Sequence, residues 1–166
     1  DILKRCGGKF KAVEGGFHFD RSLLKATDID LADCPDLGPI LFTLGCFCSG
    51  ETVIRNAGRL RLKESDRIEA MQTELQKMGA RIDVDSDTVH IQGVALHAPN
   101  APLSGHNDHR IVMALAVAAI ASGLPALLCG AEAVEKSWPA FWNVLRGLGA
   151  KIELSTDKQD EFDIKA

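Results

Sequence analysis

The sequence lacks the features of a nucleic-acid-binding or membrane-spanning protein. Its 166 residues have a formal net charge of −4, which gives no general attraction to nucleic acid or to anionic lipid. The longest apolar run, residues 111–120, is much shorter than the roughly 20 residues that span a bilayer. Any anionic ligand would therefore need a local site, and the apolar run is predicted to form a buried helix.

A disulfide framework and a zinc site are also disfavoured. The five cysteines are odd in number, and Cys46 and Cys48 would leave a helix on different faces, which makes them a poor metal-binding pair. Cys46, Cys48 and Cys129 have apolar neighbours in the sequence. We expect buried, reduced thiols of the kind found in cytosolic proteins.

The sequence contains an internal repeat of about seventy residues. Segments that begin at Leu3, Leu75 and Leu145 each place a glycine at a helix end and then start a strand, as expected because glycine accepts the left-handed conformation cheaply. An apolar helix that ends in Ser-Gly and leads into a strand opens at Asp36 and again, 72 positions later, at Asp108. Because these two sequence patterns recur with nearly the same spacing, they indicate a structural repeat.

The repeat predicts β-α-β-α-β-β units and a fold of the α/β or α+β class with mixed sheets. Two complete units are expected, over residues 27–98 and 99–155, and residues 1–26 read as the end of an earlier unit. Because that first unit has no beginning, we expect a truncated domain or a missing companion segment. Residues 156–166 are polar, and a mobile tail is expected there.

Basic residues stand at predicted helix starts, where the helix dipole disfavours them. Four predicted starts have good N-capping residues, namely Asp36, Asp66, Asp108 and Ser137. Lys63 and Arg67 flank one cap, Arg110 follows another and Lys136 precedes the last. Since each misplaced cation costs from a few tenths to about 1 kcal/mol, four of them indicate a site that holds an anion. Solvated surface bases remain the alternative.

Glu64 lies between Lys63 and Arg67 in the sequence. A carboxylate inside a cationic cluster could act as a general acid or base, or it could only pair with Arg67. His106 and His109 are near the cluster as well, but a lone histidine is more often structural than catalytic. No metal triad is recognisable.

Two segments resemble a known family. Lys-Glu-Ser-Asp-Arg at residues 63–67 is similar to a signature of the 3-phosphoshikimate 1-carboxyvinyltransferases, which are also called enolpyruvyl-shikimate-phosphate synthases. Asn-Asp-His-Arg at residues 107–110 looks like a second signature, and residues 34–39 and 130–139 match further landmarks in the same order. The resemblance covers about residues 1–154.

The resemblance implies an inside-out barrel built from such units, with this chain as part of the carboxy-terminal domain over residues 1–155. The reaction would move the enolpyruvyl group of phosphoenolpyruvate to the 5-hydroxyl of shikimate 3-phosphate and release phosphate. It would need no metal or other cofactor, no nucleic acid and no membrane. The amino-terminal domain of the same enzyme would be the partner, and a bacterial cytoplasm the location. Alone, the chain is expected to be inactive.

The resemblance also implies roles for single residues. Asp36 and Lys63 would contact shikimate 3-phosphate, with Asp36 a candidate base for the attacking hydroxyl. Glu64 would handle protons at the methylene carbon of phosphoenolpyruvate, and Lys136 would be an acid toward the leaving phosphate. The residues that would hold the anionic groups of phosphoenolpyruvate are all basic: Arg67, Arg110 and Lys136. Arg59, where some members have asparagine, receives no role.

Two other functions stay open. The sister enolpyruvyl transferase that acts on UDP-N-acetylglucosamine shares the fold and the donor. A non-catalytic anion-binding module would keep Arg67 and Arg110, but it would have no need of Glu64 or Asp36.

Overall fold

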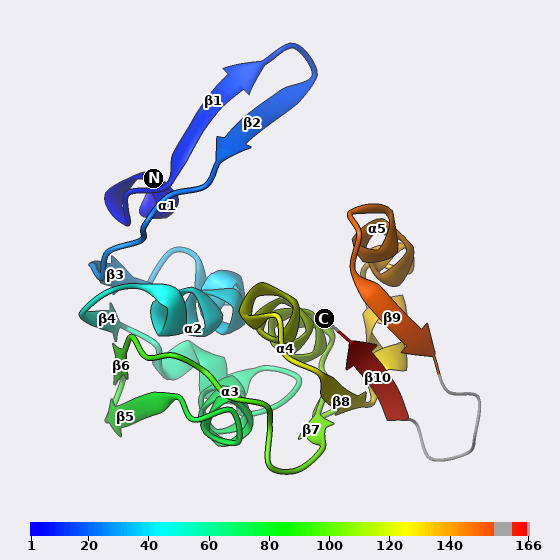
Figure 1. Cartoon of the computed structure of the whole chain (residues 1–166). Coiled ribbons are helices and arrows are strands. Elements are labelled where there is room, and N and C mark those ends of the chain that lie inside the picture. Colours follow the sequence, from blue (N-terminus) through cyan, green and yellow to red (C-terminus); the bar gives the residue numbers. More distant parts are fainter. Residues whose placement is uncertain (155–160, 166) are drawn as a thin grey trace.

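The computed structural model describes residues 1–154 in full and the backbone of residues 161–165, and it is a mixed α/β structure (Figure 1). In chain order, with η for a 3-10 helix, the elements are α1 (Ile2–Arg5), β1 (Lys9–Val13), β2 (Gly16–Asp20), β3 (Asp28–Asp30), η1 (Pro35–Leu37), α2 (Gly38–Phe47), β4 (Glu51–Arg55), η2 (Gly58–Leu62), α3 (Arg67–Gln76), β5 (Arg81–Asp85), β6 (Thr88–Gln92), β7 (Leu103–Ser104), α4 (His109–Ser122), β8 (Ala126–Cys129), η3 (Ala131–Lys136), α5 (Phe141–Gly147), β9 (Lys151–Leu154) and β10 (Glu161–Lys165).

Two four-stranded sheets have the same strand order. One is β3-β4-β6-β5 and the other is β7-β8-β10-β9. In each sheet the first two strands are parallel and the remaining pairs are antiparallel. The hairpin β1–β2 forms a sheet of its own among the described residues.

Strand β10 corrects the expected tail. Residues 161–165 pair with both β8 and β9, which is the position that β6 takes between β4 and β5. A polar sequence can form such a strand because the ladder is made by backbone groups and its two neighbours are already in place. The rest of the expected tail lies outside the described residues.

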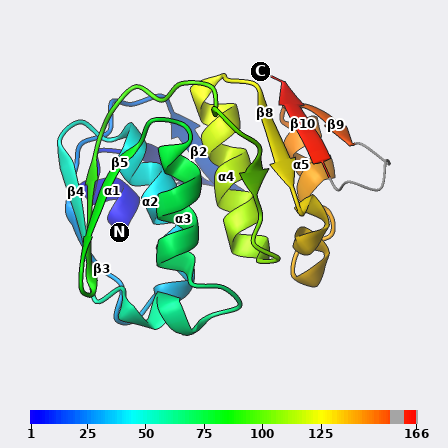
Figure 2. The same cartoon turned by 90° about the horizontal axis from the view of Figure 1, so that it is seen from below.

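Helices α2, α3 and α4 form the centre of the molecule, where they pack against one another (Figure 2). Phe42 of α2 and Leu115 of α4 are fully buried, and the Thr43 hydroxyl donates to the Ala114 carbonyl across the helix pair at 3.0 Å. The prediction of a buried helix over the apolar run is confirmed by α4. Among the described residues, no helix is long and apolar enough to cross a membrane.

Helix ends follow the predicted chemistry in most places. Gly7, Gly79 and Gly149 all have positive φ, so the three repeated glycines stop their helices as predicted. The Asp66 carboxylate accepts from two amides at the start of α3, and the Asp108 carboxylate accepts from the Arg110 amide at the start of α4. These two N-cap predictions are confirmed.

The other two predicted N-caps are wrong. Asp36 lies inside η1, and Ser137 follows η3, so a 3-10 turn or an irregular segment separates each of them from the next α-helix. Leu37 and Ala140 take the N-cap positions of α2 and α5 instead, and neither makes a side-chain capping hydrogen bond. The Asp36 carboxylate is consequently available for other partners.

The five cysteines are reduced thiols, as expected. Cys46 and Cys48 are buried as predicted, whereas Cys129 is half-buried. Burial raises the pKa of the Cys46 thiol to about 12 and that of the Cys48 thiol to about 11. Both are therefore protonated and unreactive at neutral pH.

Candidate functional site

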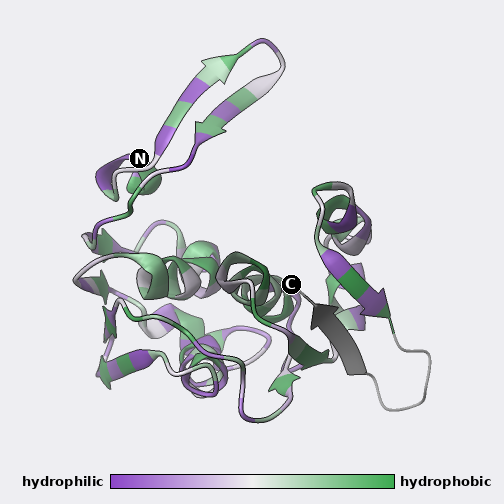
Figure 3. Ribbon diagram, in the orientation of Figure 1, coloured by the Kyte–Doolittle hydropathy of each residue, from purple (hydrophilic) through white to green (hydrophobic). Residues whose placement is uncertain are grey.

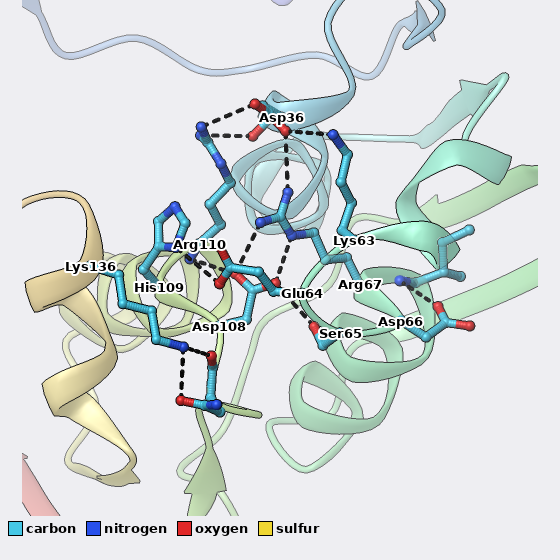
Figure 4. A network of polar contacts seen from close by, with 12 residues as sticks. Asp36, Lys63, Glu64, Ser65, Asp66, Arg67, Asp108, His109, Arg110 and Lys136 are labelled. Carbon is cyan, nitrogen blue, oxygen red and sulfur yellow. Dashed lines mark hydrogen bonds and ion pairs between the residues drawn. The ribbon is translucent and has the colours of Figure 1, made fainter.

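Three basic side chains converge on the carboxylate of Asp36 (Figure 4). Lys63 Nζ lies 3.1 Å and an Arg67 nitrogen 3.3 Å from Oδ1, and an Arg110 nitrogen lies 3.2 Å from Oδ2. A second nitrogen of Arg110 donates to the backbone carbonyl of Asp36 at 3.1 Å. The side chains come from η1, the segment before α3, and the first turns of α3 and α4, which are far apart in the sequence.

This environment stabilises the ionised form of Asp36. The hydrogen bond from Lys63 is the largest cause of the lowered pKa of this carboxyl. Desolvation, the next largest, raises the pKa, but the charges of Arg110, Lys63 and Arg67 add to the lowering. About half of the side chain remains exposed, at 52%. Asp36 is thus an accessible carboxylate that remains ionised well into the acidic range.

A buried ion pair lies beneath this cluster. Arg67 is 2% exposed and Asp108 is fully buried. Arg67 Nε donates to one carboxylate oxygen of Asp108 at 2.7 Å and a terminal nitrogen donates to the other at 3.1 Å. The bidentate geometry fixes the guanidinium plane, so the third nitrogen points at Asp36.

Hydrogen bonds keep Asp108 ionised despite its burial. Desolvation by burial raises the pKa of Asp108. Hydrogen bonds from Arg67, from the Arg110 amide and from the Ser65 hydroxyl, which lies at 3.1 Å, lower it, and so does the charge of Arg67. Together they outweigh the desolvation, so the pKa of Asp108 is lowered. Asp108 therefore caps α4 and anchors Arg67 at the same time.

Glu64 pairs with a histidine. Its Oε2 lies 3.2 Å from His109 Nδ1, across the gap between the start of α3 and the start of α4. The Glu64 side chain is 41% exposed, while the His109 side chain is 10% exposed. Since the three nitrogens of Arg67 bind Asp108 and Asp36, the alternative in which Glu64 only pairs with Arg67 is wrong.

Lys136 lies beside this group but does not join the cluster on Asp36. Its ammonium group donates to the backbone carbonyl of Asn107 and, at 2.8 Å, to the Asn107 side-chain oxygen. His106 and Asn107 both have positive φ, at 50° and 53°, an uncommon conformation that places these acceptors near Lys136. Lys136 ends η3 and does not precede an α-helix, so its expected place at a helix start is wrong.

Metal-ligand atoms also occur together here. Glu64, Asp108 and His109 offer three potential ligands within 4.8 Å of one another. Both oxygens of Asp108, however, already accept hydrogen bonds from Arg67. This donor set is a better fit for an ion-pair network than for a cation.

The structure thus brings together all of the predicted residues at the amino-terminal ends of α3 and α4, with Lys136 at the border of the site (Figure 4). Four basic side chains face three carboxylates, which leaves a surplus of one positive charge when the histidine is neutral. Sequence reasoning missed the second role of Asp108 and the contact of Asn107 with Lys136. The only signal for both was their position in the Asn-Asp-His-Arg segment.

Fold and site together define an α/β protein with a mixed-charge site suited to small anionic ligands. The chain belongs to the EPSP synthase family, because the model described as EPSP synthase (3-phosphoshikimate 1-carboxyvinyltransferase) matches residues 1–145.

Several relatives illustrate this membership. A 3-phosphoshikimate 1-carboxyvinyltransferase from Clostridium acetobutylicum is 41% identical over 152 residues, which are 92% of this chain and 35% of the relative. One from Methanocella arvoryzae is 46% identical over 86% of this chain and 32% of the relative. This chain therefore spans about a third of the length of the curated relatives that it matches.

Solved structures agree. An EPSP synthase from Acinetobacter baumannii superposes with a TM-score of 0.79 at 27% identity, over 93% of this chain and 39% of that one. An enolpyruvyl transferase from Streptomyces tendae superposes with a TM-score of 0.69 at 21% identity, over 99% of this chain and 36% of that one, a likeness of fold.

Proposed function

We propose that this chain supplies part of the active site of an enzyme that transfers the enolpyruvyl group of phosphoenolpyruvate to the 5-hydroxyl of shikimate 3-phosphate. The observation that supports this most is the convergence of Lys63, Arg67 and Arg110 on Asp36. Phosphoenolpyruvate carries a phosphate ester and a carboxylate on the same carbon, and such a donor needs several cations held in fixed positions.

In this proposal Asp36 holds the cations in place until a substrate anion arrives. Arg110 and Lys63 are partly exposed, at 34% and 27% of their side chains, so they can turn toward a phosphate or carboxylate group. Arg67 is nearly buried and keeps its two bonds to Asp108, so it offers only the nitrogen that now faces Asp36. Arg67 would therefore act as a fixed donor and Arg110 as a mobile one.

The same exchange would activate Asp36 as a base. While three cations surround it, its pKa is low and it accepts a proton poorly. When the cations turn to substrate anions, the carboxylate loses part of this stabilisation and becomes more basic. It could then take the proton of the 5-hydroxyl as the oxygen adds to the central carbon of phosphoenolpyruvate.

Glu64 and Lys136 would move the remaining protons. Addition places a proton on the methylene carbon, and elimination removes one as the bond to phosphate breaks. Glu64 is exposed enough to reach the substrate, and its contact with His109 provides a partner with which to share a proton. Lys136, held by Asn107, would donate a proton to the departing phosphate.

The proposal includes a partner, because this chain spans only about a third of its relatives' length. The amino-terminal part of such an enzyme would supply the remaining substrate contacts, and the two would form barrel-type domains in a bacterial or archaeal cytoplasm. The chain alone would show no turnover.

Phosphate release tests the proposed function. We would mix the chain with the part of the Clostridium acetobutylicum relative that it does not match, made as a separate polypeptide, and add phosphoenolpyruvate with either shikimate 3-phosphate or UDP-N-acetylglucosamine. Release only with shikimate 3-phosphate is expected. Release with the sugar nucleotide would assign the sister reaction, and silence from a mixture that associates would favour a non-catalytic module.

A matched pair of variants tests the role of Glu64. Glu64→Gln should lower turnover by about 10²–10⁴-fold, because an amide cannot exchange a proton with the methylene carbon. Glu69→Gln makes the same chemical change at an exposed position in the first turn of α3 and should leave turnover nearly unchanged. Equal rates for the two variants would contradict the acid–base role.

A further inference from the structure

Glu74 is a buried carboxylate that the proposed mechanism does not use. It lies on α3 and is 1% exposed. One carboxylate oxygen accepts from Lys77 Nζ at 2.7 Å and from the Ser104 amide at 2.8 Å, and the other lies 3.0 Å from His106 Nε2. Removing a carboxylate from water is costly unless polar or charged partners replace the water, so a buried group of this kind keeps its partners in place.

Two buried charged residues of α3 hold the segment that leads into α4. Arg67 and Glu74 are seven residues apart and therefore lie on the same face of the helix. Arg67 binds Asp108, and Glu74 contacts His106. The segment is thus attached to α3 at two points, with Asn107 between them.

The backbone between these two points has a conformation that is uncommon for residues with a side chain. His106 and Asn107 have φ values of 50° and 53°, in the left-handed region. On the other side of the turn, the Gly105 amide donates to the Cys129 carbonyl at 2.8 Å, and any side chain at Gly105 would collide with that of Val112. The turn is therefore tightly packed, and contacts outside it maintain its conformation.

This turn supplies both hydrogen-bond acceptors of Lys136. The ammonium group donates to the backbone carbonyl and to the side-chain oxygen of Asn107. Within the described part of the chain, Lys136 Nζ has no other hydrogen-bond or ion-pair partner. The position of the ammonium group therefore follows the conformation of the turn.

We propose that Glu74 and His106 are positioning residues for Lys136. Neither would touch a substrate. Their contact holds the turn at residues 105–107, so that Asn107 binds the Lys136 ammonium group with both of its oxygens. The inference rests on the proposed function, in which Lys136 donates a proton to the departing phosphate.

A purely structural role for Glu74 is the alternative. Lys77 also donates to the Pro102 carbonyl at 2.9 Å, and together with the Ser104 amide it would join α3 to β7 without any help from His106. Loss of the His106 contact would then leave Lys136 where it is.

Two amide substitutions of His106 distinguish these roles. A Gln amide nitrogen reaches nearly as far as a histidine Nε2, so His106→Gln can still bind Glu74, whereas the shorter side chain of His106→Asn cannot. Asn, however, tolerates a positive φ better than Gln does. If the contact with Glu74 maintains the turn, only His106→Gln should keep Lys136 in place. Since the His106 side chain is 34% exposed, both variants should fold.

Trace acetylation of the chain alone reports on Lys136 without any need for activity. The chain is treated with a small amount of acetic anhydride, and the rate at each lysine is obtained by peptide mass spectrometry. An ammonium group held by two acceptors reacts slowly, because it must leave them before its nitrogen can attack. His106→Asn and Glu74→Gln should raise the rate at Lys136 by at least about threefold, since hydrogen bonds to it are lost.

Two controls accompany this measurement. The rate at Lys63, which pairs with Asp36, should stay within about twofold, which excludes general unfolding as the cause. His97→Asn makes the same change at an exposed histidine whose ring contacts the neighbouring Ala98 carbonyl, and it should leave the rate at Lys136 unchanged.

Kinetics of the mixture with the separate remainder of the Clostridium acetobutylicum relative test the catalytic consequence. His106→Asn and Glu74→Gln should lower kcat by about tenfold or more and leave KM for shikimate 3-phosphate within about threefold, because a misplaced proton donor slows the chemical step without weakening the binding of the acceptor. His106→Gln should keep at least about a third of the original kcat.

Other results would overturn the inference. These are an unchanged acetylation rate at Lys136 in His106→Asn, an equal rise in His106→Gln, or altered acetylation with an unchanged kcat. If Glu74→Gln does not fold, the two variants of His106 still decide the question. If no mixture releases phosphate, the proposed function fails, whereas the acetylation rates still show whether Glu74 and His106 hold Lys136 in place.

Discussion

The hairpins β1–β2 and β5–β6 have the same sequence pattern, but only the second is buried. Both alternate apolar and polar residues in the same register, 72 positions apart, as the hydropathy colours in Figure 3 also show. In β5–β6 the apolar face lies under α2 and α3, whereas in β1–β2 it lies in solvent. Local sequence thus specifies the hairpin, but a further strand and packing against a helix stabilise it.

The comparison extends to the candidate site. Arg67 begins α3, which packs on β5, and Asp108 caps α4, which packs on β8 and β10. The exposed charges rest on this buried pair. The site is therefore placed on the rigid part of the chain. The exposed hairpin β1–β2 contributes nothing to it.

The largest contrast is expected from truncation of equivalent residues in the two hairpins. Ile91→Ala should lower the free energy of unfolding by about 2–5 kcal/mol, because it leaves a cavity under α2. Phe19→Ala, at the equivalent position, should change it by no more than about 0.5 kcal/mol in the chain alone. Urea unfolding measures both.

Similar losses in the two variants would break the comparison. They would mean that β1–β2 is covered in solution, by a second copy or by the body of the chain.

A smaller and gradual loss of stability is expected as the pH is lowered. The pKa of Asp108 is lowered in the folded chain, so its ionised form contributes stability that is fully present above the unfolded pKa of about 3.9. That contribution is lost as the pH falls through the lower pKa that Asp108 has in the folded chain. The free energy of unfolding should thus be nearly level from neutral pH to about pH 5 and should fall below about pH 4.

Asp108→Asn is the control for this dependence. Asparagine can still cap α4, but it cannot ionise, so the variant should be less stable at neutral pH and should lose less stability in acid. An unchanged acid dependence in the variant would place the responsible carboxyl elsewhere, with Asp36 the next group to replace.

Much of the fold was readable from the sequence because it depends on local chemistry. Gly7 and Gly79 end helices at the predicted positions, and Asp66 caps α3 as predicted. The cap predictions for Asp36 and Ser137 failed because η1 and η3 intervene, and a 3-10 turn has no sequence signal as strong as that of an α-helix.

The sequence predicted which residues belong to the site, but not which of them contact one another. The cations at helix starts pointed to Lys63, Arg67 and Arg110, because their charge conflicts with the helix dipole. No local pattern indicates that Glu64 meets His109, 45 residues away, or that Lys136 binds Asn107. These contacts depend on how the helices pack, which periodicity does not specify.

Hydrogen exchange of the isolated chain tests the difference between the two hairpins most directly. The amides that β6 shares with β4 and β5 should open only with an energy close to that of global unfolding, because helix α2 and two strands cover them. The amides of β2 should exchange within a small factor of an unstructured peptide. Equal protection of the two strands would contradict the account, because it would show that the apolar face of β1–β2 is already covered.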